Sequence, residues 1–184
     1  EGSSAGDENA GARTAPHVDH PASSSTAVGR TRRHQEGVRQ LRGKPLTDFL
    51  RRVQRPDLDL VFVLQDVQDP VNVGSAFRIA DAVGVTRMVL TGITTRPPHA
   101  LIKKVGRGRD RRVAWDYQED AAETIGALRE QGYRTVAVEI TAQSVPYDQA
   151  EYGDRVALVV GHEDHGVTNR SLAACDLVVY LPMF

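Results

Sequence analysis

Short apolar runs rich in β-branched residues recur along most of the chain, and they constrain its fold more than any other feature. Their length is typical of strands, and they lie at residues 60–65, 87–91, 134–140, 155–160 and 176–181. Segments whose apolar residues have helical spacing lie between most of these runs. One has the apolar stripe Ala76, Ile79, Ala80 and Val83, and another has the stripe Ala121, Ile125 and Leu128, after which Gly132 can end the helix. This alternation predicts an α/β fold: a mostly parallel sheet with helices on both faces and right-handed crossovers.

The 184 residues allow one folded domain with an N-terminal extension. Residues 1–29 contain Gly, Ala, Ser, Pro and His in no periodic order, so we expect a disordered tail. Residues 30–55 are basic and are interpreted as a solvated linker or a short amphipathic helix. The folded domain is predicted to occupy residues 56–184.

The net charge of −1 conceals two basic clusters. Residues 30–55 contain nine Arg or Lys, and residues 103–112 contain six. Such clusters suit the phosphate backbone of a nucleic acid. The candidate RNA-binding residues are Arg51, Arg52, Lys103, Lys104, Arg107 and Arg109.

Cysteine content and hydropathy indicate a soluble protein of the reducing cytoplasm. Cys175 is the only cysteine, which excludes an intrachain disulfide and a CxxC metal site. The N-terminus has no apolar signal-peptide region, and no run of about 18 apolar residues could cross a membrane. We therefore expect no membrane association and no metal.

One strand-like run leads through a polar elbow into a helix, between Val61 and Arg78. Ligands of open α/β sheets bind at such crossings. Asn72 can cap the helix, and Gly74 lets a ligand or another backbone come close. A purely structural alternative remains at this point, in which Asn72 is only a cap and Arg78 pairs with Asp81 on the surface.

Two further runs end in the same way and can reach the same edge of the sheet. The run at 155–160 leads through Gly161 into His162-Glu163-Asp164-His165, and the run at 176–181 leads into Pro182 and Met183. Four adjacent ionisable residues need partners or solvent. Turn chemistry is one explanation, with Asp164 or Thr168 capping a helix at 168–174. A metal site is disfavoured, because adjacent residues cannot easily converge on one ion.

Nucleotide-binding signatures are weak or absent. A dinucleotide fold needs GxGxxG directly after a strand, whereas the one GxG, at 106–108, lies inside a basic run. No Walker A sequence occurs, so nucleotide hydrolysis has no support.

Three segments together resemble the motifs of the SpoU/TrmH-type RNA ribose 2′-O-methyltransferases of the SPOUT superfamily. In order, they are Asn72-Val-Gly-Ser-Ala-Phe-Arg78 with its continuation to Gly84, Leu158-Val-Val-Gly161-His-Glu163 with Gly166, and Leu181-Pro182-Met183. Thr91–His99 and Val113–Asp116 look similar too. The resemblance covers residues 57–184, and three motifs in order are more specific than any one.

The resemblance implies an α/β domain with a trefoil knot that binds S-adenosylmethionine, acts as a homodimer and methylates a ribose 2′-hydroxyl of tRNA or rRNA. By motif, Arg78 is the catalytic arginine, Asn72 supports it, and Glu163 with the Gly161 backbone shapes the pocket. The donor-binding residues are expected to be Gly161, Leu181, Met183 and Glu139. Since a guanidinium is a poor base at neutral pH, Arg78 is expected to hold a phosphate or the developing alkoxide.

Three departures from the family pattern qualify this interpretation. His162 replaces a small polar residue, and Ile79 replaces a threonine on what we expect to be the packed face. The chain stops at Phe184, where the family continues with a segment that closes the knot, so we expect a C-terminally incomplete domain. The alternative function is a non-catalytic RNA-binding or assembly module that retains the fold.

Overall fold

The computed structural model describes residues 40–53 and 57–183. The tail expected at 1–29 lies outside the described residues, and the domain boundaries remain a prediction. Helix α1, Gly43–Arg52, lies within the basic segment and buries none of its side chains. Its apolar residues Leu46, Phe49 and Leu50 are all exposed.

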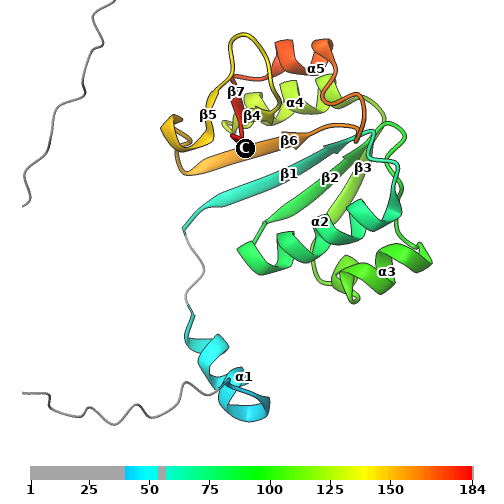
Figure 1. Cartoon of the computed structure of the whole chain (residues 1–184), viewed down its shortest axis with the longest axis vertical. Helices are drawn as coiled ribbons and strands as arrows, with labels where there is room; N and C mark the ends of the chain where they lie inside the picture. The colour runs from blue at the N-terminus through cyan, green and yellow to red at the C-terminus, as the bar shows by residue number, and fades with distance from the viewer. Residues whose placement is uncertain (1–39, 54–56, 184) are drawn as a thin grey trace, which may run out of the picture. The chain divides into compact units, whose positions relative to one another are not determined.

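A parallel sheet forms the centre of the domain (Figure 1). Its strands are β1 (Asp59–Gln65), β2 (Arg87–Thr91), β3 (Trp115–Gln118), β4 (Arg134–Val138), β5 (Val145–Pro146), β6 (Arg155–Val160) and β7 (Leu177–Tyr180). The order is β3-β2-β1-β6-β4-β7-β5, and every pairing is parallel. The predicted fold class is confirmed.

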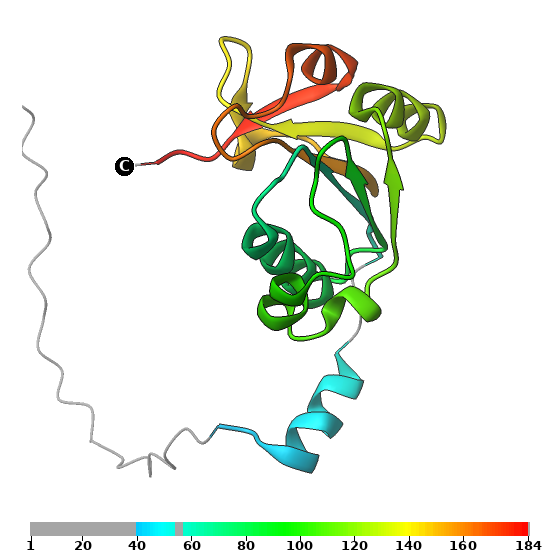
Figure 2. The same cartoon turned by 90° about the vertical axis from the view of Figure 1, so that its right-hand side faces the viewer.

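Helices cover both faces of this sheet (Figures 1 and 2). Helices α2 (Pro70–Val83) and α3 (Ala100–Gly106) lie on one face, and α4 (Ala121–Glu130) and α5 (Asn169–Ala174) lie on the other. Two short 3₁₀ helices, η1 (Arg109–Arg111) and η2 (Tyr147–Gln149), lie in the connections. Among the described residues, no helix is long and apolar enough to cross a membrane.

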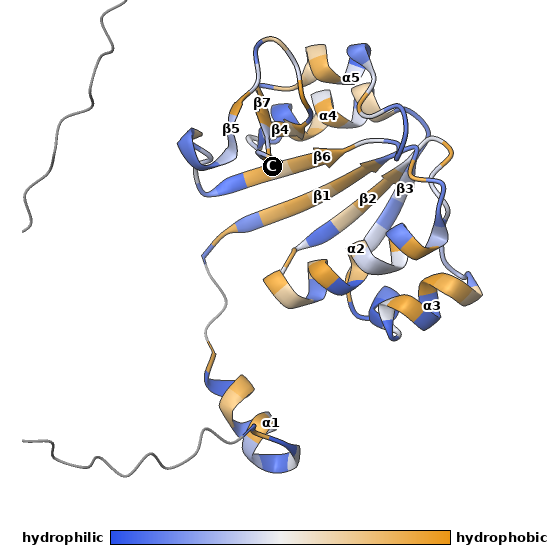
Figure 3. Ribbon diagram, in the orientation of Figure 1, coloured by the Kyte–Doolittle hydropathy of each residue, from blue (hydrophilic) through white to orange (hydrophobic). Residues whose placement is uncertain are grey.

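Alternate residues of β1 supply two separate cores. Val61 and Val63 pack with Ile125 of α4, and Leu64 packs with Phe77 of α2. Both faces of the central strands are therefore apolar, as the colours of β1 and β6 show in Figure 3, and as expected for a parallel sheet covered on both sides. A strand buried on both faces leaves its carboxyl end as the place for polar chemistry.

The five predicted strands are all present, and two further ones were missed. β3 has the sequence Trp-Asp-Tyr-Gln, and only its alternate residues are apolar, so it lacks the continuous run expected of a central strand. It lies at the edge of the sheet, where such a run is not needed. β5 is two residues long and ends in proline, which is confined to sheet edges.

The buried stripe of α2 differs from the predicted one. The helix buries Val73, Phe77 and Ala80, whereas Ile79 and Val83 are 53% and 47% exposed. Ile79 is thus not on the packed face. The predicted stripe on α4 is confirmed, because Ala121, Ile125 and Leu128 are all buried.

Gly74 is the point of closest approach between α2 and α3. A Cβ added to Gly74 would lie 3.0 Å from the carbonyl oxygen of Ile102. The sequence left open whether Gly74 faces a ligand or another backbone, and in the structure it faces the backbone of α3. This packing fixes α3 against the helix that carries Asn72 and Arg78.

Candidate functional site

Two of the polar elbows meet at the carboxyl edge of the sheet. β1 and β6 are paired in parallel, with Leu64 opposite Val160, so the chain leaves both strands on the same side. β7 ends at this edge as well, on the far side of β4. The expected convergence of three elbows at one edge agrees with this topology.

The side chain of Glu163 joins the first two elbows. Its Oε1 accepts hydrogen bonds from the backbone N–H of Asp69 at 3.1 Å and from the Asn72 amide at 3.0 Å. Its Oε2 accepts a hydrogen bond from the backbone N–H of Gln68 at 3.2 Å. We call this arrangement the Glu163 clamp. It brings together two of the three predicted catalytic residues, Asn72 and Glu163.

These hydrogen bonds favour the ionised form of Glu163. Desolvation raises the pKa of this carboxyl group, but hydrogen bonds from Asn72 and from backbone N–H groups outweigh that effect. The net result is a pKa below the ordinary value of 4.5. Glu163 is therefore a fixed anion at neutral pH whose oxygens are already engaged, which suits positioning better than proton transfer.

Asn72 does not cap helix α2, contrary to one reading of the sequence. Asp69 is the cap, and its carboxylate accepts a hydrogen bond from the Val71 N–H at 2.8 Å. Pro70 then begins the helix, a position that suits its missing N–H. Asn72 consequently lies inside the first turn, where its side chain is free to reach Glu163.

Arg78 does not pair with Asp81, so the purely structural alternative is wrong. The Asp81 carboxylate contacts Arg109 at 2.7 Å and Arg112 at 3.6 Å. Arg78 is exposed and makes no ion pair within residues 40–53 and 57–183. The third predicted catalytic residue thus has its charge available, one helical turn beyond Gly74.

Two glycines shape the loop that carries Glu163. A Cβ on Gly161 would collide with the backbone of Gly166, and Gly166 has a positive φ of 65°. Backbone hydrogen bonds between His162 and Gly166 close the loop in both directions. The Glu139 carboxylate accepts a hydrogen bond from the Val167 N–H at 2.9 Å, so it supports this loop.

Gln65 is a buried polar residue that the sequence reading missed. It is the last residue of β1 and only 4% exposed. Its Nε2 donates to Oγ1 of Thr168 at 3.0 Å, and Thr168, one of the two caps that the sequence suggested, caps α5. The sequence signal that could have identified Gln65 is its position as a polar residue at the end of an otherwise apolar run.

His162 is held by its own turn. Its Nδ1 accepts a hydrogen bond from the Asp164 N–H at 3.0 Å, and its ring centroid lies 4.7 Å from that of His165. In the described part of the chain, no three His, Cys, Asp or Glu side chains are grouped to hold a metal ion.

The expected donor residues of the third motif lie beyond β7. Leu181 and Met183 are 53% and 83% exposed, and Ile140, which follows the neighbouring strand β4, is 67% exposed. Three large apolar side chains are thus left uncovered after two adjacent strands. Their contact with a methyl donor remains a proposal.

The basic candidates fall into two groups. Lys103, Lys104 and Arg107 are exposed on and after α3, and Arg51 and Arg52 are exposed in the last turn of α1. Two of the candidates are engaged by carboxylates, because Arg51 contacts Asp48 at 3.5 Å and Arg109 contacts Asp81 at 2.7 Å. Within the described residues, Lys103, Lys104 and Arg107 make no ion pair.

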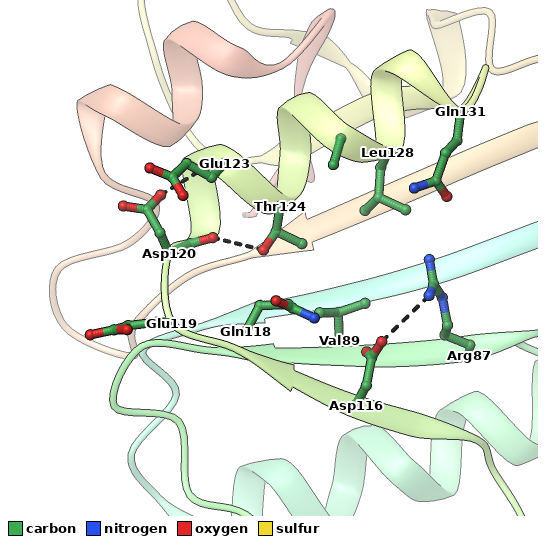
Figure 4. A pocket seen from close by; sticks show the side chains of 11 residues that line it. Arg87, Val89, Asp116, Gln118, Glu119, Asp120, Glu123, Thr124, Leu128 and Gln131 are labelled. Atoms are coloured by element: carbon green, nitrogen blue, oxygen red, sulfur yellow. Dashed lines mark hydrogen bonds and ion pairs between the residues drawn. The ribbon is translucent and has the colours of Figure 1, made fainter.

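An acidic cleft lies on the other face of the sheet, between β3 and α4 (Figure 4). It has a volume of about 610 Å³, and its acidic residues are Asp116, Glu119, Asp120 and Glu123. In Figure 4, the Asp116 carboxylate points toward Arg87, and the distance between Oδ2 and the guanidinium Nη1 is 3.4 Å. Among the described residues, Arg87 is the one cation that lines the cleft. Arg170 engages both Asp120 and Glu123, and Arg87 is held by Asp116. The described lining therefore offers no unpaired cation to a nucleic-acid backbone.

Cys175 is not a candidate nucleophile. Burial and the neighbouring Asp176 raise the pKa of its thiol to about 12. The thiolate, which is the reactive form, is therefore negligible at neutral pH.

Comparison with known proteins identifies relatives of the whole folded region. A model of the SpoU rRNA Methylase family matches residues 59–184. The 23S rRNA (guanosine-2′-O-)-methyltransferase RlmB of Vibrio cholerae is 32% identical over 148 residues, which are 79% of this chain and 58% of that protein. The protein of the same description from Nitrosomonas europaea is 34% identical over 140 residues, 75% of this chain and 52% of its own length.

Solved structures share the fold. An rRNA methyltransferase from Sinorhizobium meliloti superposes with a TM-score of 0.65 at 26% identity, covering 73% of this chain and 52% of that one. The AdoMet-bound structure from the same organism gives a TM-score of 0.65 at 25% identity, covering 73% and 51%. The chain thus spans about half the length of the relatives that it matches.

The Glu163 clamp is expected to make stability depend on pH. Because the folded-state pKa is lowered, the stabilisation is fully present above the unfolded-state value of about 4.5 and is lost as the pH falls through the lower folded value. Urea unfolding of the wild type and of Glu163→Gln should therefore differ most near neutral pH and converge in acid. Glu151→Gln, which changes an exposed carboxylate, is the matched control. A difference that does not shrink below pH 4.5 would contradict the clamp.

Proposed function

Since the chain belongs to the SpoU rRNA methylase family, we propose that it forms the catalytic domain of an enzyme that methylates a ribose 2′-hydroxyl of tRNA or rRNA in the cytoplasm, with S-adenosylmethionine as the donor. The observation that carries the proposal is the Glu163 clamp at the start of α2, the helix that also carries Arg78. The clamp joins two motifs that are far apart in the chain. A non-catalytic RNA-binding module is the competing function.

Arg78 supplies a fixed positive charge on the acceptor side. Its guanidinium stays protonated at any physiological pH, so it stabilises an anion rather than accepting a proton. The anion is a phosphate of the RNA or the oxygen that becomes negative as the 2′-hydroxyl attacks. Asn72 and Glu163 act by fixing the first turn of α2, and thus the helix on which Arg78 lies.

The methyl donor fits the exposed apolar residues at the ends of β4 and β7. Ile140, Leu181 and Met183 would cover the apolar parts of S-adenosylmethionine, which supplies an electrophilic methyl group when bound. Glu139 acts indirectly, because its carboxylate already accepts hydrogen bonds from Val167 and Ile140 N–H groups. The tightly turned backbone after Gly161 forms the neighbouring wall.

Replacing Arg78 with alanine should abolish methyl transfer while leaving donor affinity within about twofold. The reason is that Arg78 acts on the acceptor, and a lost charge contact at a reacting oxygen costs about 10²-fold or more. Transfer of label from S-adenosylmethionine to total rRNA and tRNA measures activity, and calorimetry measures donor binding. Arg134→Ala, at the start of β4 on the opposite edge of the sheet, is the control.

Two outcomes would change the interpretation. A large loss of donor affinity in Arg78→Ala would place the arginine on the donor side. A wild-type protein that binds RNA and transfers no label to either RNA would favour the binding module.

We propose that the exposed cations of α3 and α1 bind RNA phosphates. The pair Lys104 and Arg107 is free of ion pairs within the described residues, whereas Arg109 is held by Asp81. A variant with both Lys104→Ala and Arg107→Ala should bind RNA less tightly, and its salt dependence should be flatter by about two charges. Filter binding between 50 and 200 mM salt measures both. An unchanged slope would remove α3 from the interface.

We also propose that the protein acts as a homodimer, an expectation from the family resemblance. Ile79 and Val83 support it, because these two apolar residues are one turn apart on α2 and about half exposed. Sedimentation should show a dimer at micromolar concentration, and Ile79→Asp should weaken it because a buried unpaired charge is costly. Ile140→Asp is the control, because this isoleucine is also exposed (67%, against 53% for Ile79) and is distant in sequence. A monomeric, active wild type would refute the proposal.

A further inference from the structure

The loop between β2 and α3 and the start of β3 line two neighbouring cavities that are open to solvent. Their volumes are about 630 and 580 Å³, and both are lined by Pro97 and Trp115. Trp115 is partly buried and packs against the core beneath α2 and α3. Part of the indole is therefore anchored in the core, while another part forms a wall that the two cavities share.

Among the charged residues that line the two cavities, cations outnumber carboxylates. Lys103 and Arg111 line one cavity, and Arg96 lines the other. The Arg96 guanidinium lies 4.0 Å from the centre of the Tyr117 ring, which holds it in place. The one carboxylate that lines either cavity belongs to Asp110, and its Oδ1 is buried without a hydrogen-bond partner.

This combination matches the chemistry of a nucleotide. Aromatic rings provide a surface on which nucleobases stack, and lysine and arginine bind the phosphates. An acidic peptide would also find the cations, but its carboxylate side chains offer no flat ring for the indole.

The cavities are fixed to the Glu163 clamp by a short chain of hydrogen bonds. The backbone N–H of Thr95 donates to the carbonyl of Val67 at 3.0 Å, and the Thr95 hydroxyl donates to the carbonyl of Gln68. Gln68 in turn donates its N–H to Glu163. The loop beside Trp115 is thus bonded directly to the elbow of the candidate active site.

We propose that the cavity lined by Trp115, Lys103 and Arg111, which we call the Trp115 cavity, binds one nucleotide of the RNA near the target ribose. Its base lies against the indole, and its phosphate contacts Lys103 and Arg111. The inference rests on the proposed function, because it makes the cavity a specificity subsite for the same RNA. It also gives a role to the segments 91–99 and 113–116, which the motifs leave without one.

The single tryptophan makes the test direct, because fluorescence excited at wavelengths that the five tyrosines do not absorb reports on Trp115 alone. Guanosine 5′-monophosphate should quench it saturably, whereas ribose 5-phosphate, which has no base, should not. Lys103→Ala and Arg111→Ala should each weaken the binding of the mononucleotide about fivefold or more. Lys104→Ala, on the same helix but outside the cavity lining, should bind within twofold of wild type.

Methyl transfer supplies a second readout. Trp115→Leu should raise the KM for RNA about tenfold with little change in kcat, since stacking on an aromatic ring is lost. Trp115→Phe retains a ring and should restore most of the affinity. Circular dichroism and urea unfolding exclude a simple folding defect.

The outcomes separate this inference from the function on which it rests. Quenching that is absent, or equal with ribose 5-phosphate, overturns the subsite even if Arg78-dependent methyl transfer is found. A KM that Trp115→Leu leaves unchanged overturns it as well. Saturable base-dependent quenching without any methyl transfer would refute the enzyme and keep the nucleotide site. Quenching by an acidic peptide but not by the mononucleotide would assign the cavity to a protein partner.

Discussion

The carboxylate of Glu163 connects two loops that are 94 residues apart in the chain. The parallel pairing of β1 with β6 makes this connection possible, because both strands end at the same edge. Each oxygen accepts at least one hydrogen bond from the first elbow. A glutamine has only one acceptor oxygen, so it could not receive the same set. The ionised acid therefore holds the first turn of α2 to the second elbow, while the Asp69 cap and the burial of Val73 and Phe77 hold the rest of the helix.

Backbone geometry makes the Glu163 loop rigid enough for this role. Gly161 and Gly166 approach more closely than any side chain would allow, and Glu139 holds the loop from β4. On the other side, Gln65 connects the end of β1 to Thr168 at the start of α5. The loop follows β6 directly and is also held from the ends of β4 and β1. A site fixed in this way needs little rearrangement before reaction, which is a large part of how positioning contributes to rate.

The sequence predicted the strands with long apolar runs and the edge where their elbows meet, because both follow from local periodicity. It failed where a distant partner decides the outcome. Asp81 has Arg78 three residues before it, yet it is held by Arg109 and Arg112. Asn72 looked like a cap because Asp69 and Pro70, which begin the helix, were read as part of the elbow. The stripe on α2 was misplaced because α3, a later segment, determines which side is covered.

The distribution of charge explains how a chain with a net charge of −1 can present a surface for phosphates. Acidic residues collect in the cleft between β3 and α4, on one face of the sheet (Figure 4). The free cations of α3 lie on the opposite face, with α2 and Arg78 (Figure 1). Asp81 of α2 pairs with Arg109 and Arg112, and these ion pairs hold η1 against α2. On the function proposed above, the exposed cations of α3 would draw RNA toward the face formed by α2 and α3, which is the face that carries Arg78.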